Sequence, residues 1–466
     1  MLDIRRSPAG RWLAGAAAMA LAVTLGGVPR GPAAAYPPGD VGATTEQYVE
    51  TFYPLWFTNL QFALAPKNKF IGPDRISPIY QSVVAINDDT LYASSPIDTS
   101  DGPVHIRVPA SRRVGYSVLL LDAFGNVYDS PVPSKAAGIR MPATRYTLVG
   151  PGTGARVPPR AAVLPYDFMF MIFRADKFSG EADLTTQAEA FRRRLRINRE
   201  ATAVVPERDY ATPFKLIADR RANNRPIAFL RGLQRAVASP IHPPLPAADQ
   251  QLVEEFDAAF GDGRDLSPEE RAAFADATRT AHAAIVANYL DHRGATNWTH
   301  FTNIGDWGTA VLDRSSITEF CQYCNGISTA AYYHAFYDVA GEPLVGATRG
   351  GYVINFAAPG SANGMTPDAS RFWSLTAYTP RSVELIPNRA NKYVVARYTP
   401  GLTYNGDGSL TVHISRVKPA GVPAANWLPV RRRQFNVMLR VYGVVAGSTV
   451  AENTYLPPPI TPAATP

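Results

Sequence analysis

The stretch at residues 435–442, Phe-Asn-Val-Met-Leu-Arg-Val-Tyr, decides the fold class. Its β-branched and aromatic residues favour extended chain, and alternate residues of a strand share a face, which places Met438, Arg440 and Tyr442 together. This face is either buried or lines a cleft. Comparable short runs, separated by turns rich in glycine and proline, predict further antiparallel strands. These runs lie at residues 104–108, 116–121, 146–149, 351–356, 372–378, 393–397 and 410–414.

The composition agrees with a chain of many short strands. The 466 residues include 41 prolines and 35 glycines, and only 18% are charged, which disfavours long helical bundles and coiled coils. An apolar share of 46% excludes disorder throughout the chain. At roughly 150 residues per domain, the length suggests about two or three domains.

Two regions interrupt the strand pattern with helical spacing. Residues 44–64 predict a leading helix, in which Thr44 and Gln47 fit a capping box and Pro54 introduces a kink. Residues 182–291 predict several helices, and the clearest helix start is the run Ser-Pro-Glu-Glu at Ser267. We therefore expect a mainly β fold with a helical middle, made of two antiparallel, jelly-roll-like β-sandwich domains.

The chain divides into four expected parts. Residues 1–35 form a signal peptide, and residues 36–181 an N-terminal β-sandwich domain with its leading helix. Residues 182–330 form the helical middle segment, and residues 331–466 a C-terminal β-sandwich domain.

The signal peptide is expected because a basic start precedes a short apolar run. Arg5, Arg6 and Arg11 come before the uncharged residues 12–28, and cleavage is expected between Ala35 and Tyr36. An uncleaved anchor is the alternative, but the run is shorter than the roughly 20 residues that span a bilayer. We expect a protein exported to the periplasm, the cell envelope or the medium, with no transmembrane segment after cleavage. The export route stays open.

The charge of the exported chain indicates few electrostatic partners. The full sequence carries a net charge of +7, and residues 1–35 contain four arginines and one aspartate, so the mature chain carries +4. So small an excess disfavours a nucleic-acid partner. Association of identical chains through sheet edges remains an alternative.

The chain has two cysteines, Cys321 and Cys324, in a C-x-x-C pair. An even number of cysteines in an exported protein favours a disulfide. Free thiols with a redox role, or a metal site, are the alternatives. The seven histidines are scattered and complete no zinc motif, so no metal site is predicted.

A polar motif precedes one of the predicted strands. Asn87, Asp88 and Asp89 follow one another, and Tyr92 stands shortly after them. Such residues most often build a turn with their own backbone. Two neighbouring carboxylates could instead bind calcium, or divide acid and base roles between them.

Three further polar residues lie at the ends of apolar strands: Asp122, Asn126 and Arg174. A buried Arg174 would need a carboxylate, because an unpaired buried charge is costly. Asp122 and Asp89 are the candidate partners. A structural ion pair and a ligand site are both open.

Near the C-terminus, Asn426 and Trp427 form either a packed corner or one edge of a ligand pocket. Arg440 is a further candidate, because it shares a strand face with Tyr442.

Several of these motifs, taken together, resemble a tandem family. Residues 85–92, 102–109 and 122–127 are similar to the domain of unknown function numbered 1254. Residues 372–378, 405–411, 426–429 and 435–442 are similar to its usual companion, the domain numbered 1214. The resemblance implies a two-domain, largely β protein with jelly-roll-like sandwiches, and implies no activity. Gly125 stands where the family more often has threonine, and the C-x-x-C pair departs from the family pattern.

The sequence carries no signature of a common enzyme class. It lacks the G-x-S-x-G elbow, the phosphate-binding loop and the dinucleotide fingerprint, and no motif in it identifies a cofactor, so any cofactor is unknown. We expect a binding or structural module for a small apolar or sugar-like ligand at the junction of the two domains. One alternative is an enzyme that acts on a small organic molecule through carboxylates and Arg174, and another is a β-sandwich assembly module.

Overall fold

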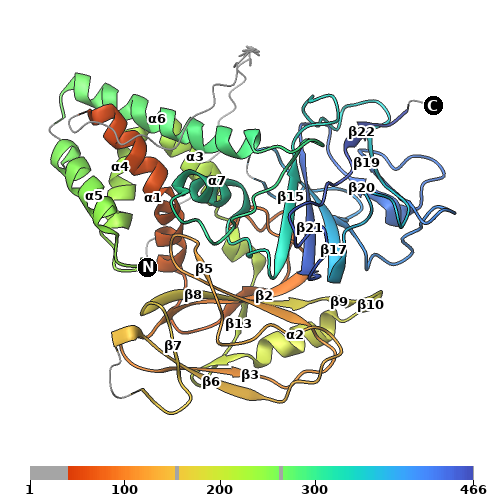
Figure 1. Ribbon diagram of the computed structural model, residues 1–466, viewed down its shortest axis with the longest axis horizontal. Coiled ribbons are helices and arrows are strands. Elements are labelled where there is room, and N and C mark those ends of the chain that lie inside the picture. The colour runs from red at the N-terminus through yellow and green to blue at the C-terminus, as the bar shows by residue number, and fades with distance from the viewer. Residues whose placement is uncertain (1–39, 153–156, 262–265, 382, 465–466) are drawn as a thin grey trace, which may run out of the picture. The chain divides into compact units, whose positions relative to one another are not determined.

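The computed structural model describes residues 40–152, 157–261, 266–381 and 383–464. The predicted signal peptide and its cleavage point lie outside these residues. Within them, most of the helices form one block and the strands form two groups (Figure 1).

The first strand group consists of two sheets that share an apolar core. A six-stranded sheet has the order β13-β1-β2-β8-β4-β5, and a five-stranded sheet has the order β12-β11-β3-β6-β7. Leu91 and Phe173 of the first sheet pack in one cluster with Ile106 of the second. The strands of the six-stranded sheet are β1 (Ile71–Pro73), β2 (Thr90–Asp98), β4 (Tyr116–Leu121), β5 (Val127–Tyr128), β8 (Phe168–Asp176) and β13 (Ala203–Val205). Those of the five-stranded sheet are β3 (Val104–Val108), β6 (Thr144–Val149), β7 (Ala162–Val163), β11 (Arg196–Ile197) and β12 (Glu200–Ala201).

Strand β8 is buried along its whole length because both faces of its sheet are covered. Met171 and Phe173 belong to the cluster between the two sheets, whereas Phe170 and Ile172 pack against the helices. A strand covered on both faces needs apolar residues at every position, and this explains the unbroken run Phe-Met-Phe-Met-Ile-Phe.

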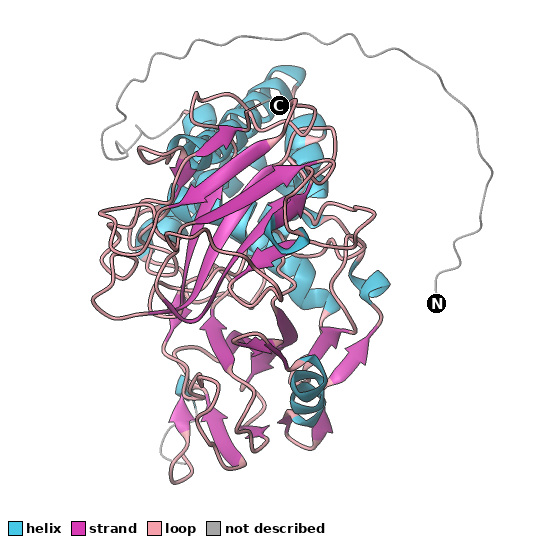
Figure 2. Ribbon diagram, turned by 90° about the vertical axis from the view of Figure 1, so that its right-hand side faces the viewer, coloured by secondary structure: helices cyan, strands magenta, loops and turns pink. Residues whose placement is uncertain are grey.

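The second strand group also pairs two sheets over one core. A five-stranded sheet has the order β14-β15-β21-β17-β18, and a four-stranded sheet has the order β20-β19-β16-β22. Trp373 and Leu439 of the first pack with Ile354 of the second, and Figure 2 shows the strands side by side. The strands of the five-stranded sheet are β14 (Trp298–Thr299), β15 (Ala330–Ala335), β17 (Ala369–Tyr378), β18 (Val394–Ala396) and β21 (Asn436–Val444). Those of the four-stranded sheet are β16 (Tyr352–Phe356), β19 (Leu410–Ser415), β20 (Trp427–Pro429) and β22 (Ile460–Pro462).

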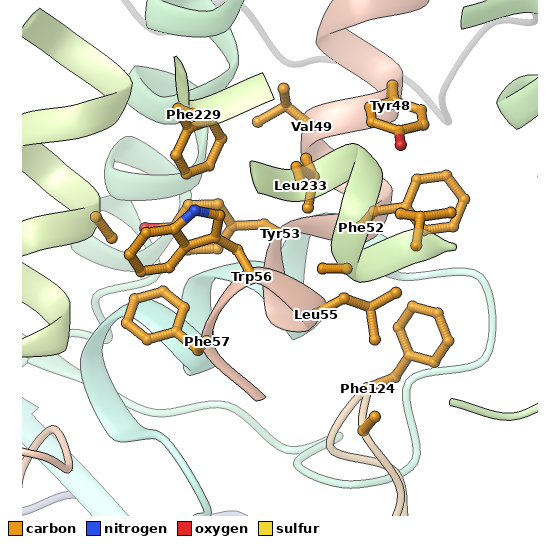
Figure 3. Packing of buried hydrophobic residues seen from close by; sticks show 14 of the residues in the cluster. Tyr48, Val49, Phe52, Tyr53, Leu55, Trp56, Phe57, Phe124, Phe229 and Leu233 are labelled. Atoms are coloured by element: carbon orange, nitrogen blue, oxygen red, sulfur yellow. The ribbon is translucent and has the colours of Figure 1, made fainter. Parts of the chain in front are cut away.

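The helical block is built around α1 (Val41–Leu64), which contacts α4, α5, α6 and α7. Figure 3 shows Tyr53, Trp56 and Phe57 of α1 packed beside Phe229 of α4. The helix is buried on most sides, so apolar and aromatic residues recur all round it. The other helices of the block are α3 (Phe214–Asn224), α4 (Pro226–Val237), α5 (Ala247–Phe260), α6 (Pro268–Asp291) and α7 (Val311–Cys321). A shorter helix, α2 (Thr185–Arg194), packs on the first strand group.

Two helix starts test the capping predictions. The predicted box at the start of α6 is confirmed, because the Ser267 side chain accepts from the Glu270 backbone and the Glu270 side chain accepts from the Ser267 backbone. The predicted start of α1 at Thr44 is wrong. The helix begins three residues earlier, at Val41, where the Asp40 carboxylate accepts from the backbone N–H groups of Gly42 and Ala43.

The expectation of a mainly β fold is only partly right. Helix accounts for 28% and strand for 27% of the chain, and there is no closed barrel among the described residues. Three of the sheets are also mixed rather than purely antiparallel, because β1 pairs with β13, β6 with β7 and β19 with β20 in parallel. Each parallel pair adds a short strand of two or three residues to a sheet after a crossover, and strand patterning in the sequence carries no information on direction. The jelly-roll topology stays a prediction.

Part of the range predicted as the helical middle belongs to the first strand group. Strand β11 pairs with β3, and β13 pairs with β1, although both follow residue 182. None of the helices in the described part of the chain has the length and apolar character that a membrane crossing requires.

Replacing Phe57 by alanine tests the central position of α1. Phe57 is fully buried, so the Phe57→Ala variant is expected to lose about 3–5 kcal/mol of unfolding free energy through lost apolar burial and the cavity that remains. Urea unfolding followed by circular dichroism measures the loss. Leu64→Ala on the same helix is the control, because Leu64 is 72% exposed and its removal should cost less than about 0.5 kcal/mol. Equal losses in the two variants would contradict the packing described here.

Candidate functional site

A cavity of about 60 Å³ lies where the two strand groups meet the end of α7. We call it the junction cavity. Aromatic side chains dominate its lining, and two arginines, one from each strand group, contribute the charges. The lining residues are Pro73, Tyr80, Val83, Val84, Ala85, Ile86, Asn87, Tyr92, Ser94, Phe170, Ile172, Arg174, Tyr210, Gln322, Tyr323, Cys324, Tyr332, Arg440 and Tyr442.

Strand register brings the polar lining residues together. Tyr92 of β2 stands opposite Arg174 of β8, and Tyr332 of β15 stands opposite Arg440 of β21. Residues opposite each other in an antiparallel pair share a face. The predicted common face of β21 is therefore the face that presents Arg440 and Tyr442 to the cavity.

The segment at residues 83–89 connects the two strand groups through hydrogen bonds, and its residues 83–87 line the cavity. The Asn87 amide donates to the Tyr442 hydroxyl at 3.1 Å, and the Tyr378 hydroxyl donates to the Ile86 carbonyl at 2.7 Å. Asn87 also orders its own turn, because its side-chain oxygen accepts from the backbone N–H of Asp89. The turn predicted for this motif is therefore present, and it also serves as an anchor between the strand groups.

Ala85 in this segment has a backbone conformation that alanine rarely adopts. Its φ angle is +55°, and its N–H donates to the carbonyl of Val383, whose φ angle is +49°. Left-handed conformations cost residues with a Cβ about 1–2 kcal/mol each and are kept where the surroundings demand them. Here they aim the Ala85 carbonyl at the Arg440 guanidinium, which donates to it.

Among the described residues, no carboxylate lies within ion-pair distance of the buried Arg174, so neither candidate partner, Asp122 or Asp89, pairs with it. Its guanidinium donates to the Asn325 amide oxygen at 2.9 Å and to the Tyr323 carbonyl at 2.7 Å. It also lies over the Tyr92 ring, 5.6 Å from the ring centre. The guanidinium charge is therefore stabilised by hydrogen bonds to a neutral amide and a carbonyl and by a cation–π contact with an aromatic ring.

The acidic residues of the motif lie away from the cavity lining. Asp88 forms an ion pair with Lys177 at 2.8 Å. Asp89 is buried and accepts from the hydroxyls of Ser374, at 2.8 Å, and Tyr398. Burial raises the pKa of the Asp89 carboxyl, although these hydrogen bonds and the charge of Arg440 act in the opposite direction. With their oxygens directed to different partners, the two carboxylates form no shared calcium or acid–base site.

The other predicted residues serve local structure. The buried Asp122 accepts from the Asn126 amide at 2.8 Å and from the Tyr128 hydroxyl at 2.9 Å, which fixes a tight turn. Asn426 bonds the backbone of Thr403, and the Trp427 indole donates to the Ser415 carbonyl at 3.1 Å. This arrangement is the packed corner, the alternative to a pocket edge.

The predicted disulfide between Cys321 and Cys324 is confirmed, because the two sulfurs lie at bonding distance. The bridge closes the end of α7 and holds Tyr323, whose φ angle is +60°, with its carbonyl toward Arg174. Cys324 itself lines the junction cavity. The disulfide thus supports one wall of the cavity.

A second cluster of charged residues lies among the helices, and sequence analysis did not find it. Lys215 of α3 donates to Glu319 of α7, and Tyr53 of α1 donates to the other oxygen of the same carboxylate. The His282 imidazole lies 3.5 Å from an oxygen of Asp219 and 3.7 Å from one of Glu319. Lys215, Asp219, His282 and Glu319 are among the residues that line a groove of about 590 Å³. The only local signal is the i,i+4 spacing of Lys215 and Asp219, which is common on helices.

Asp219, His282 and Glu319 present ligand atoms within 4.8 Å of one another, as a metal ion would require. Lys215, however, already neutralises Glu319, and its ammonium occupies the space beside that carboxylate. Burial lowers the pKa of His282, but the nearby carboxylates of Asp219 and Glu319 outweigh burial and raise it to about 9. With both cations charged, the cluster balances its two carboxylates without a metal.

The His282 charge predicts a loss of stability at alkaline pH. Because its pKa rises from 6.5 to about 9 on folding, its contribution is complete below pH 6.5 and is lost as the pH rises through about 9. The difference in melting temperature between the wild-type protein and the His282→Gln variant should therefore shrink from pH 7 to pH 10. Calorimetry at each pH measures it, and a constant difference would contradict a charged His282.

Thiol labelling tests the disulfide. Without reductant, the unfolded protein should take up no maleimide, and after reduction it should take up label on both cysteines. The Cys321→Ser/Cys324→Ser double variant should unfold with a free energy lowered by about 2 kcal/mol, because the bridge closes a very short loop. Labelling of the unreduced protein would refute the disulfide.

Comparisons with known proteins agree with the tandem order of the motifs. The family described as protein of unknown function DUF1254 matches residues 67–199, and the one described as protein of unknown function DUF1214 matches residues 329–445. Together the two matches span more than half of the chain. No curated protein matches it.

Two solved structures are similar to this chain. The crystal structure of the VPA0106 protein from Vibrio parahaemolyticus covers 91% of this chain and 100% of its own, with 17% identity and a TM-score of 0.55. That of an uncharacterised protein from Burkholderia cenocepacia covers 88% of this chain and 92% of its own, with 13% identity and a TM-score of 0.42. The first of them shares the fold. On the two family matches and their order, the chain belongs to the tandem family in which DUF1254 precedes DUF1214.

Proposed function

We propose that this protein is an exported binding protein that holds a small organic molecule in the junction cavity. The observation that carries the proposal is the cavity itself, which takes its lining from both strand groups and from the disulfide-closed end of α7. Aromatic walls with a few converging polar groups are the usual composition of small-molecule sites.

The size of the cavity limits the ligand. A buried water molecule needs roughly 10–15 Å³ of cavity volume. The junction cavity, at about 60 Å³, therefore has room for about four or five non-hydrogen atoms or water-sized groups. A complete sugar ring with its hydroxyls is larger. The volume therefore favours a short organic molecule with an apolar part over the sugar-like ligand expected from sequence.

The lining also favours binding over acid–base catalysis. An enzyme of the predicted kind would need a carboxylate at the cavity, and Asp88, Asp89 and Asp122 all bond other groups. Export is supported by the signal-peptide pattern of residues 1–35 and by the disulfide, since disulfides persist in oxidising compartments.

Ligand-observed NMR with a library of small organic molecules tests the proposal. Ser94 lines the cavity, so the Ser94→Leu variant should fill part of it and lose binding of any fragment that the wild-type protein binds there. Ser179→Leu is the matched control, because Ser179 lies exposed in β9 (Phe178–Ser179), outside the cavity, and should leave binding unchanged. Absence of binding by the wild-type protein, or equal binding by Ser94→Leu, would refute the proposal.

A further inference from the structure

We propose that the ligand of the junction cavity is a small carboxylate, bound at its charged end by Arg174 and Arg440. This inference rests on the proposed function and adds the chemical class of the ligand. Three observations on the cavity carry it: an unbalanced charge, unpartnered hydrogen-bond donors and apolar walls beside them.

The charge around the cavity is not balanced by the protein. Among the described residues, no carboxylate lies within ion-pair distance of Arg174 or Arg440, although both side chains are buried. Asp89 is the acidic group that interacts with Arg440 from further away. Even a fully ionised Asp89 offsets one of the two guanidinium charges, so one positive charge remains. An uncompensated buried charge is costly, and a bound anion would remove that cost.

The other charges near this region are already paired. Lys177 bonds Asp88 at 2.8 Å, and Arg371 forms a bidentate pair with Asp176. Within the described parts of the chain, these pairs leave no acidic group for Arg174. The contrast with the Lys215 cluster is informative, because there two cations face two carboxylates and no ligand is needed to balance them.

Unpartnered polar atoms show where an anion would bind. The Nε of Arg174 and one terminal nitrogen of Arg440, Nη1, are buried and lack a hydrogen-bond partner, as does the hydroxyl of Tyr210. All three residues line the cavity. Buried donors are nearly always satisfied in folded proteins, and guanidinium N–H groups can only donate. A carboxylate offers two oxygen acceptors and forms strong, charge-assisted hydrogen bonds with arginine.

The walls select an organic acid over an inorganic anion. Phe170, Ile172 and Val84 line the same small cavity as the two arginines. A sulfate or phosphate would press its polar oxygens against these apolar side chains and leave them unsatisfied. A monocarboxylate with a short aliphatic tail places its charge at the guanidinium groups and its tail against the apolar wall.

Sodium propionate and propionamide form the decisive pair of probes, because they have nearly the same size and differ in charge. Titration calorimetry on the full-length mature protein should show propionate binding at least tenfold more tightly than propionamide. A ligand of five non-hydrogen atoms is limited by its size to a Kd in the micromolar range or weaker. Sulfate should bind more weakly than propionate.

The outcomes separate this inference from the proposed function. If propionamide binds as tightly as propionate or more tightly, or if sulfate binds more tightly than propionate, the inference of a carboxylate ligand is overturned. Binding of a neutral fragment that Ser94→Leu abolishes, with no binding of propionate, also overturns the carboxylate and leaves the proposed function standing. If no probe and no fragment binds the wild-type protein, both fail.

Substitution of the arginines adds a second readout. The Arg174→Gln variant should bind propionate at least tenfold more weakly than the wild-type protein does, and should lose less of its affinity for propionamide. Arg314→Gln is the matched control: Arg314 is also buried, donates to a backbone carbonyl and has an unpartnered Nε, but it lies outside the cavity. Unchanged propionate binding in folded Arg174→Gln overturns the inference. Should that variant not fold, the wild-type probe pair still decides.

Discussion

The structure depends on a buried set of hydrogen bonds between the segment at residues 83–89 and the five-stranded sheet of the second strand group. Asn87 bonds Tyr442, Asp89 bonds Ser374, and the Ala85 carbonyl accepts from Arg440. Each such bond contributes about 1 kcal/mol net, but leaving one of its buried groups unsatisfied costs about 1–3 kcal/mol. A shift of one strand group against the other would break several of these hydrogen bonds together. The penalty for leaving their buried groups unsatisfied therefore fixes the position of the segment.

This constraint explains why a cavity lined by two arginines persists. Arg174 is fixed in the first strand group by Asn325 and Tyr323, and Arg440 is fixed in the second by the Ala85 carbonyl. Neither can approach a carboxylate without losing these bonds. Like charges held in one cavity repel each other, and the left-handed conformations at Ala85 and Val383 add local strain. Such costs are often kept in proteins where they serve recognition, and here they are consistent with the anion site that we propose.

The sequence could predict those features that follow from local patterns. The strand at residues 435–442 and the start of α6 at Ser267 follow from alternation and from a capping box, and both are confirmed. The parallel edge strands were missed because β13 and β20 are only three residues long and their direction depends on the path of the chain. Both helical regions were indicated by the sequence, at residues 44–64 and 182–291, so the expectation of a mainly β fold came from giving the many short strand runs too much weight.

The site was predictable in part, because some of its residues stand out in local sequence patterns. Asn87, Tyr92, Arg174 and Arg440 were singled out from sequence, and all four line the junction cavity. Asp122 and Asn426 were singled out too, but short polar side chains at strand ends most often satisfy local backbone, as these do. The Lys215–Glu319 pair joins residues 104 positions apart, and only tertiary structure reveals such a contact.

The chemistry of the lining residues supports recognition rather than proton transfer. Burial raises the pKa values of the Tyr80, Tyr92 and Tyr442 hydroxyls, so these groups stay protonated near neutral pH and act as hydrogen-bond partners rather than bases. Arginine keeps its proton at any physiological pH. Asp89, the acidic group that interacts electrostatically with Arg440, is engaged by two hydroxyls. A cavity whose charged and phenolic groups hold fixed protons can select a ligand by charge and size, and its selectivity should vary little across the neutral range.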